Sequence, residues 1–364
     1  MSHSTHLVFK SPLHQMAAST CTELWIDSCA PAELNYAIEH GAVGATSNPV
    51  IVGEVLKKEL PAYAPRIDAL IKENSEASED EIAWEIIEEM AGKAAALLHP
   101  IFVRDNKKRG RLSVQTSPKF WNNAAAMIKQ AEHLNALAPN IQIKIPVTKA
   151  GIAAIEEVTA RGISVNATVS FAVAQTIAVA EAVERGLARR KADGKSSEDM
   201  TPVCTIMVGR VDDWMRVVAE RDGITGDPGA TNWAGVAVMK KAYGIFLKRG
   251  FKTRLLAAAY RCHMHWSEFV GGDVILSIPF KYQKLFNSSG IKVESRMDTP
   301  VDAKILAELM RFEEFRRSYN EEGLKVEEFD TFGPTRRTLR QFIAGYQDLV
   351  GLIRERMIPN PDVK

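Results

Sequence analysis

The 364-residue chain lacks several features that identify particular protein classes. Its four cysteines are widely spaced and form no C-x-x-C pair, so a disulfide framework is not indicated and a reducing cytoplasm is the expected location. No apolar run approaches the roughly 18 residues that cross a membrane. The first residues, MSHSTHLVFKSPLHQ, lack the cationic start and apolar core of a secretory signal.

The chain also lacks an excess of charge of either sign. The chain has 46 basic and 45 acidic residues, which leaves a net charge of +1. This balance gives no reason to expect a nucleic-acid or membrane-surface partner. The chain contains neither G-x-G-x-x-G nor G-x-x-x-x-G-K, so the common glycine-rich nucleotide turns are absent as well.

The sequence does contain a regular alternation of strand-like and helix-like segments. Alternating strands and helices predict a parallel sheet with right-handed crossovers, and eight such units favour a closed (β/α)8 TIM barrel. An open doubly wound sheet is the alternative. The eight predicted strands lie near residues 23–28, 42–47, 111–116, 141–146, 163–169, 203–209, 254–260 and 273–278.

The predicted domain organisation is simple. Residues 1–20 are expected to form an N-terminal tail, and residues 21–364 a single barrel domain. Extra helices over about 301–358 are too short for a separate domain, so we expect this C-terminal extension to pack on the barrel. It divides into helical segments at about 301–318 and 334–357.

Two stretches interrupt the strand–helix rhythm. Residues 50–108 are predicted to hold two helices instead of one. Residues 221–235, RDGITGDPGATNWAG, are rich in Gly, Asp, Asn and Pro. They predict a long loop after the sixth strand, on the face where barrels carry their active sites.

The polar positions of the strands follow a pattern. In NIQIKIPVTKAG, Ile141, Ile143 and Ile145 share one parity and Lys144 has the other. Helices cover the outside of a parallel barrel, so the apolar parity should face outward and the polar parity inward. The inward polar residues near the strand ends are Asp27, Asn48, Gln115, Lys144, Asn166 and Thr168.

A lone lysine that faces into the barrel suggests a catalytic site. An amine in a desolvated pocket has a depressed pKa and becomes a nucleophile toward carbonyl groups. The iminium ion that forms accepts electrons and permits cleavage of a neighbouring carbon–carbon bond, with a nearby carboxylate to move protons. A structural Lys144–Asp27 ion pair is the alternative that the residues alone leave open.

Six segments in order resemble the transaldolase family of class I Schiff-base aldolases. They are LWIDSC, GATSNP, IKIPVT, VNATVSFAVAQ, VGRVDDW and AAAYR, spread over roughly residues 22–285. The resemblance implies that Lys144 forms a Schiff base with a ketose. It further implies that Asp27 shuttles protons and that Thr168 helps to hold a catalytic water.

The same resemblance implies a substrate-binding set. Two asparagines would hold a three-carbon ketol unit, and two arginines would clamp a phosphate, for which the planar guanidinium is suited. Either arginine taken alone could instead be a surface ion-pair partner. The set consists of Asn48, Asn166, Thr205, Arg210 and Arg261.

The chain departs from the family pattern at four positions. Gln115 stands where typical members have glutamate, as in the fructose-6-phosphate aldolase branch, and it cannot ferry a proton. Met207 stands where that branch has a tyrosine, and Ala259 where a serine is usual. Thr205 replaces a serine or alanine. With one hydroxyl fewer at the anion pocket, a sulfonate or a bulkier acceptor becomes an alternative to an ordinary sugar phosphate.

The expected function is therefore transfer of a dihydroxyacetone unit from a ketose phosphate to an aldose. The alternatives are a lyase that releases free dihydroxyacetone and a non-catalytic barrel that binds sugar phosphates. No metal or organic cofactor is expected, because His263 and His265 make an incomplete ligand set and Cys29 and Cys262 are interpreted as packing residues. The expected partners are small anionic sugars, and a homodimer is compatible with the sequence.

Overall fold

The computed structural model, which describes residues 8–362, contains a closed barrel of eight parallel strands in chain order. Strand β8 pairs with β1 and closes the sheet, so the prediction of a TIM barrel is confirmed. The strands are β1 (Glu23–Asp27), β2 (Ala42–Thr46), β3 (Arg111–Gln115), β4 (Ile141–Pro146), β5 (Val165–Ser170), β6 (Val203–Ile206), β7 (Arg254–Ala257) and β8 (Ile275–Ile278).

Strands β6 and β7 end about three residues earlier than the alternation predicts. After β6 the chain turns directly into a helix at Val208. After β7, Ala259 adopts a left-handed conformation with φ of 65°, which an extended strand cannot include.

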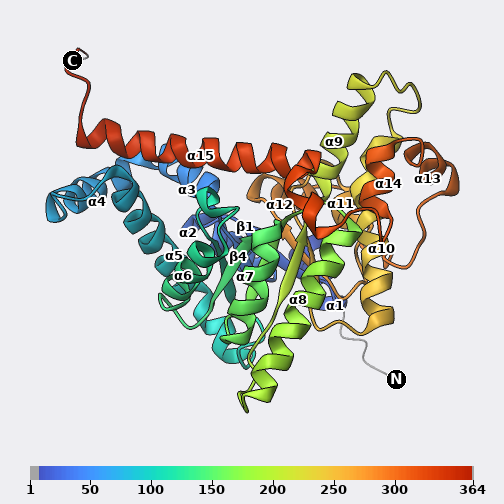
Figure 1. Cartoon of the computed structure of the whole chain (residues 1–364), viewed down its shortest axis with the longest axis horizontal. Coiled ribbons are helices and arrows are strands. Elements are labelled where there is room, and N and C mark those ends of the chain that lie inside the picture. The colour runs from blue at the N-terminus through green and yellow to red at the C-terminus, as the bar shows by residue number, and fades with distance from the viewer. Residues whose placement is uncertain (1–7, 363–364) are drawn as a thin grey trace.

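Helices surround the barrel, as Figure 1 shows. Two of them begin with side-chain caps. Asn123 accepts a hydrogen bond from the Ala126 N–H, and Thr148 accepts one from the Gly151 N–H. The surrounding helices are α2 (Pro31–Glu39), α6 (Ala124–Asn135), α7 (Lys149–Ala160), α8 (Val173–Ala192), α9 (Val208–Arg221), α10 (Ala234–Arg249), α11 (Met264–Ser267) and α12 (Phe280–Asn287).

The core has two parts, as expected for a barrel. The strand residues of apolar parity, such as Ile141, Ile143 and Ile145, are buried in the large cluster that joins sheet and helices. A second, smaller cluster contains the inward-facing residues Trp25 and Leu256. The predicted assignment of parities is therefore confirmed for β4.

The segment before β1 is more ordered than the predicted tail. Ser11 caps helix α1 (Pro12–Ser19), and Pro12 occupies its first turn. Leu13 and Met16 lie three residues apart on one face of this helix and are fully buried, so the helix packs on the barrel. Residues 1–7 of the predicted tail lie outside the described part of the chain.

Residues 50–108 hold three helices rather than the two predicted. They are α3 (Pro49–Lys58), α4 (Leu60–Glu73) and α5 (Glu79–Arg104). A proline in the first turn of α4 separates it from α3, because proline is tolerated there but interrupts a continuous helix. A capping box between Ser78 and Glu81 starts α5.

The loop within 221–235 lies farther from the sixth strand than predicted. Helix α9 intervenes and rises away from the barrel, with the loop at its far end (Figure 1). Apolar residues at three- and four-residue spacing explain this helix, because Val208, Val211, Met215 and Val218 are all buried. The end of the stretch forms a short 3-10 helix, Ala230–Trp233.

The C-terminal extension packs on the barrel. The predicted helix at 301–318 is two short helices, α13 (Ala303–Leu309) and α14 (Glu313–Tyr319), separated by extended backbone at Phe312. Helix α15 (Gly333–Met357) follows a 3-10 turn, Val326–Thr331. In Figure 1 α15 crosses the end of the barrel beside α3, with which it makes extensive contact.

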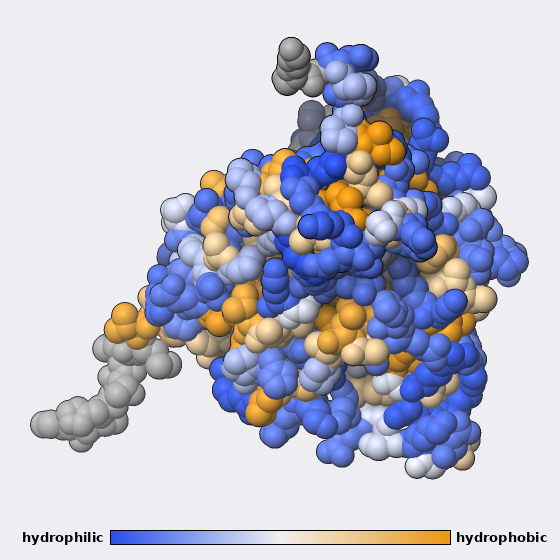
Figure 2. Space-filling model, turned by 90° about the vertical axis from the view of Figure 1, so that its left-hand side faces the viewer, coloured by the Kyte–Doolittle hydropathy of each residue, from blue (hydrophilic) through white to orange (hydrophobic). Residues whose placement is uncertain are grey.

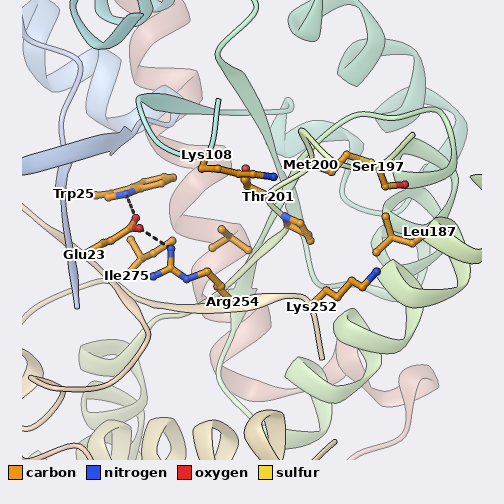
Figure 3. Close-up of a pocket in the computed structure, with 12 residues that line it drawn as sticks. Glu23, Trp25, Lys108, Leu187, Ser197, Met200, Thr201, Lys252, Arg254 and Ile275 are labelled. Atoms are coloured by element: carbon orange, nitrogen blue, oxygen red, sulfur yellow. Dashed lines mark hydrogen bonds and ion pairs between the residues drawn. The ribbon is translucent and has the colours of Figure 1, made fainter. Parts of the chain in front are cut away.

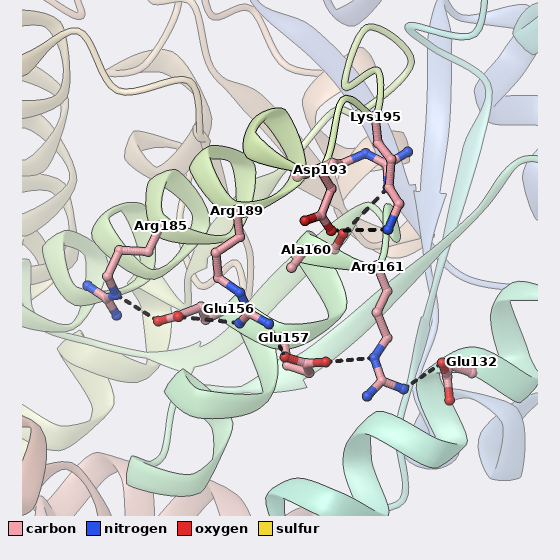
Figure 4. Close-up of polar contacts among 10 residues, drawn as sticks. Glu132, Glu156, Glu157, Ala160, Arg161, Arg185, Arg189, Asp193 and Lys195 are labelled. Atoms are coloured by element: carbon pink, nitrogen blue, oxygen red, sulfur yellow. Dashed lines mark hydrogen bonds and ion pairs between the residues drawn. The ribbon is translucent and has the colours of Figure 1, made fainter.

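The surface is that of an ordinary globular protein. Figure 2 shows small hydrophobic patches separated by hydrophilic residues. Figure 4 shows charged side chains linking α6, α7 and α8, in which Arg161 contacts Glu157 at 2.8 Å and Glu132 at 2.6 Å. These exposed pairs add little stability, because water screens them. Among residues 8–362, no helix is both long and apolar enough to cross a membrane.

Docking of α15 can be tested at Leu349, which is fully buried and faces Gly53 of α3. Leu349→Ala should lower the free energy of unfolding by about 3 kcal/mol, because it removes buried methyl groups and leaves a cavity. Urea denaturation measures the change. Gln347→Ala, at an exposed position of the same helix, should change it by less than about 0.5 kcal/mol, and equal effects would contradict the docking.

Candidate active site

Lys144 lies inside the barrel, where its strand register places it between two polar neighbours. It pairs with Gln115 of β3 on one side and with Asn166 of β5 on the other. The lysine is 5% exposed, and its ammonium group forms no ion pair with any carboxylate in the described part of the chain. Burial lowers the pKa of Lys144, and the charge of Asp27 only partly opposes this.

Asp27 ends β1 and is held by a relay of hydroxyl groups. Thr46 donates its hydroxyl proton to Asp27 Oδ1 at 2.5 Å. Because a threonine has only one such proton, Ser277 must donate in its own 2.6 Å contact with Thr46. Burial raises the pKa of Asp27, while Lys144 and the Thr46 hydrogen bond lower it. Burial is the largest of these effects, so the pKa of Asp27 lies above its ordinary value.

Asn166 has a fixed amide orientation. The Thr205 hydroxyl donates to its Oδ1 at 2.6 Å, and its Nδ2 donates to Ser113 Oγ at 3.1 Å. Ser113 in turn donates to Gln142 Oε1 at 2.8 Å, and Gln142 Nε2 donates to the Thr201 carbonyl. This buried network spans β3 to β6 and holds the asparagine beside Lys144.

Asn48 has a different role from Asn166. Its Oδ1 accepts hydrogen bonds from the N–H groups of Val50 and Ile51 and so caps α3. The capping oxygen is therefore occupied by the helix, and only the amide N–H groups remain for a ligand. This capping role is not among the predictions from the sequence, although an asparagine before proline is a typical helix start.

Among residues 8–362, eight buried hydroxyl and amide oxygens lack hydrogen-bond partners. Three of them lie along β3 and β5 and belong to Gln115, Thr168 and Ser170. Such orphaned buried atoms are uncommon and often mark binding sites. Between Thr168 and Ser170, Val169 adopts φ of 59°, and the pairing of β5 with β6 shifts register there. A β-branched residue rarely adopts this conformation, so the end of β5 is strained.

The two predicted phosphate-binding arginines lie close to each other. Arg210 is on the first turn of α9, and burial together with the charge of Arg261 lowers its pKa to about 10. Arg261 is bound by Asp213, whose Oδ2 accepts from Nε at 3.0 Å and from Nη2 at 2.8 Å. The ion-pair interpretation therefore holds in part for Arg261, whereas Arg210 has no carboxylate partner among the described residues.

Helix α15 contributes residues that the sequence analysis missed. Arg210 Nη1 donates to Thr338 Oγ1 at 3.4 Å and also contacts Gln341 Oε1. Gln175 Nε2 lies 3.4 Å from Thr335 Oγ1. These contacts join the barrel mouth to a helix more than a hundred residues later, and no local sequence pattern indicates them.

A cavity at the opposite end of the barrel is separate from these residues. Figure 3 shows Glu23, Trp25 and Arg254 among its lining residues, and its volume is about 220 Å³. Glu23 and Arg254 form an ion pair at 2.9 Å across it. Residues at this N-terminal end of a barrel generally contribute to stability rather than catalysis.

One group of side chains has the composition of a metal site. Atoms of Asp212, Cys262 and His265 lie within 4.8 Å of one another. However, His265 Nδ1 accepts the Arg261 N–H at 3.1 Å and Nε2 contacts Asp212 Oδ2 at 2.8 Å. Both ring nitrogens are occupied by protein groups, so this arrangement does not fit a metal ligand. His263 contacts Ser267 instead.

The structure defines a (β/α)8 barrel with a buried lysine inside it that has no ion-pair partner among residues 8–362. Residues 24–333 match the family model described as transaldolase/fructose-6-phosphate aldolase. The chain belongs to this family.

Individual relatives agree with the family match. The chain is 32% identical over 247 residues to a transaldolase of Thiobacillus denitrificans, covering 65% of this chain and 67% of the relative. It is 30% identical over 197 residues to a transaldolase of Neisseria gonorrhoeae and to transaldolase 2 of a Nostoc species. These two matches cover 52% of this chain, and 55% and 51% of the relatives. The chain thus spans about two thirds of one relative and about half of the other two.

The cost of burying Lys144 can be measured directly. Lys144→Met should raise the free energy of unfolding by about 1 to 2 kcal/mol at pH 7, because it removes a buried amine that has no ion-pair partner among residues 8–362 and keeps the volume. Burial lowers the pKa of Lys144 in the folded protein. The cost of burying its amine is therefore present below the pKa of lysine in the unfolded chain, and it disappears as the pH rises through that value, about 10.4. Urea denaturation at pH 7 and pH 10.5 tests both statements.

Lys240 provides the matched control. Its side chain is 9% exposed and pairs with Glu268 at 2.8 Å. Lys240→Met should therefore destabilise the protein by about 3 kcal/mol, because a shielded carboxylate keeps only the longer 3.6 Å contact with Arg296 and two backbone carbonyls lose their donor. If Lys144→Met destabilises the protein to the same degree, Lys144 is a structural ion-pair partner.

Proposed function

We propose that this protein is a transaldolase-type enzyme that transfers a dihydroxyacetone unit from a ketose phosphate to an aldose through a Schiff base on Lys144. The observation that carries the proposal is a buried lysine between Gln115 and Asn166 inside the barrel, which has no ion-pair partner in the part of the chain that the structure describes. The printed names of the relatives, transaldolases, support the same reaction class. A merely structural lysine would be expected to have a carboxylate partner.

The reaction begins at the nitrogen of Lys144. Because burial favours the neutral amine, this nitrogen attacks the ketose carbonyl carbon. The former carbonyl oxygen leaves as water after taking one proton from the amine and one from Asp27, and an iminium ion remains. Asp27 then accepts the proton of the hydroxyl group next to the bond that breaks. The electron pair of the cleaved carbon–carbon bond moves to the iminium, an aldehyde leaves, and an enamine of three carbons remains on the lysine.

The second half of the reaction reverses these steps with a new acceptor. The enamine attacks the aldehyde carbon of an aldose, and Asp27 returns its proton to the new hydroxyl group. Water then releases the ketose from Lys144. Gln115 and Thr168 are proposed to hold that water, because each has a buried oxygen without a partner among the described residues.

The two asparagines are proposed to hold the enamine between the two halves of the reaction. Asn166 is fixed by Thr205 and Ser113, so it can orient a hydroxyl group without reorganising. The free N–H groups of Asn48 can donate to a second hydroxyl group. Arg210 and Arg261 would bind the phosphate at the other end of the sugar.

A lyase that releases free dihydroxyacetone is the second candidate. Gln115 favours it, because a glutamine at this position resembles the aldolase branch, and the family description names both activities. Met207 opposes it, because its thioether cannot donate a hydrogen bond to a water as the tyrosine of that branch would.

Borohydride trapping tests the Schiff base. Treatment with sodium borohydride and fructose 6-phosphate should leave a reduced adduct on Lys144, identified by peptide mass spectrometry. Reduction converts the iminium to a stable secondary amine, so one adduct per chain is expected. Lys144→Met should show no adduct and no turnover, and residual turnover in that variant would exclude the mechanism. Absence of any adduct with all ketoses tested would favour a non-catalytic barrel.

The fate of the three-carbon unit separates transferase from lyase. In the absence of an acceptor, a transaldolase should release dihydroxyacetone in amounts no larger than the enzyme, because the enamine stays bound. Addition of an aldose phosphate should then restore turnover. An enzymatic assay of free dihydroxyacetone measures both, and continuous release without acceptor would identify a lyase.

A further inference from the structure

A buried pair of side chains lies directly behind Arg261. Asp212 is on α9, two residues after Arg210, and His265 is on α11. Both side chains are fully buried, and His265 Nε2 contacts Asp212 Oδ2 at 2.8 Å. None of the proposed reaction steps uses either residue. Burying a carboxylate and an imidazole costs free energy unless each of their polar atoms has a hydrogen-bond partner.

The contacts form a continuous chain through the protein. The Arg261 N–H donates to His265 Nδ1 at 3.1 Å. With that nitrogen accepting, the ring carries its proton on Nε2 and donates it to Asp212 Oδ2. The other oxygen, Oδ1, accepts the N–H of Gly235 at 2.8 Å. The pair therefore links the backbone of Arg261 to α9 and to the start of α10.

Protonation of His265 is opposed by this geometry. Burial lowers the pKa of His265, whereas hydrogen bonding and charge from Asp212 and Cys262 raise it, with a balance of about 9, which would charge the ring at neutral pH. A charged ring would direct an Nδ1 proton at the Arg261 N–H, which already donates there. The hydrogen bond from the Arg261 N–H therefore requires a neutral His265 ring, whose Nε2 proton is donated to Asp212.

The backbone beside this pair is packed too closely to tolerate much movement. A side-chain carbon added at Gly209 would lie 2.0 Å from the Ala259 carbonyl oxygen and 2.7 Å from Arg261 Cγ. Ala259 itself adopts φ of 65°, which costs conformational energy for a residue other than glycine. The start of α9 and the segment that carries Arg261 are therefore pressed together.

This close approach brings together two guanidinium groups that repel each other. The charge of Arg261 helps to lower the pKa of Arg210. Asp213 compensates the Arg261 side chain, but it does not contact the backbone of that residue. Without an anion between them, the two arginines require a rigid support to keep their spacing.

We propose that Asp212 and His265 are positioning residues that hold the backbone of Arg261 against α9, so that Arg210 and Arg261 bind one phosphate-class anion together. The pair acts through Arg261 and touches no substrate. The inference rests on the proposed function for the identity of the substrate, but the binding of an anion can be measured without turnover.

The experiment uses inorganic phosphate as the probe and isothermal titration calorimetry as the measurement. Asp212→Asn and His265→Asn should each weaken phosphate binding by about tenfold to a hundredfold, the range expected when a binding group is displaced by up to 1 Å. For fructose 6-phosphate the KM should rise while kcat changes little. His263→Asn, on the same segment but bonded to Ser267, is the matched control and should bind phosphate like the unmodified protein.

Trapping with dihydroxyacetone provides the second readout. This ketone lacks an anionic group, so borohydride should attach it to Lys144 equally well in all four proteins. Equal trapping shows that the barrel is folded and that only the anion site has changed. If Asp212→Asn does not fold, His265→Asn decides alone, because asparagine retains an acceptor and fills less space.

The possible outcomes separate this inference from the proposed function. Phosphate binding that is unchanged in folded variants, or absent in the unmodified protein, overturns the positioning role. Weaker phosphate binding in the variants supports the positioning role, even if neither ketone is ever trapped on Lys144. In that last case only the proposed Schiff-base function fails.

Discussion

The proposed mechanism depends on one unfavourable placement, a lysine inside the barrel that has no counter-ion at contact distance among residues 8–362. Desolvation favours the neutral amine, and the parallel register fixes its neighbours as Gln115 and Asn166. Asp27 is near enough to influence the pKa of Lys144 but forms no ion pair with it among the described contacts. This incomplete compensation is what a nucleophilic amine needs, because a tight ion pair would keep it charged and unreactive.

The two ends of the barrel differ in what their polar residues contact. At the N-terminal end, Glu23 and Arg254 form an ion pair beside an apolar interior layer. Toward the C-terminal end, the buried oxygens of Gln115, Thr168 and Ser170 have no hydrogen-bond partners among residues 8–362, and Val169 is strained. Such costs persist only where the surrounding structure is rigid. The hydrogen-bond network from Thr205 to Gln142 and the crossing helix α15 supply that rigidity.

Sequence reasoning succeeded where the physical rule is local and periodic. A period of two along each strand separates Lys144 from its isoleucine neighbours, and alternation of elements predicts the closed barrel. It failed where tertiary contacts decide. The Val169 bulge contradicts the ordinary preference of valine, Gln341 reaches Arg210 from 131 positions away, and the order of α1 depends on burying Leu13 and Met16 against the barrel. The hydroxyl relay to Asp27 needed the closing of β8 onto β1, which places Ser277 beside Thr46.

The most direct test of this account is a crystal structure of the protein reduced with borohydride in the presence of fructose 6-phosphate. The account predicts continuous density from Lys144 Nζ to the former carbonyl carbon, with Asp27 at hydrogen-bond distance from a substrate hydroxyl group and the phosphate between Arg210 and Arg261. An unmodified Lys144, or a covalent bond to any other residue, would contradict the central claim.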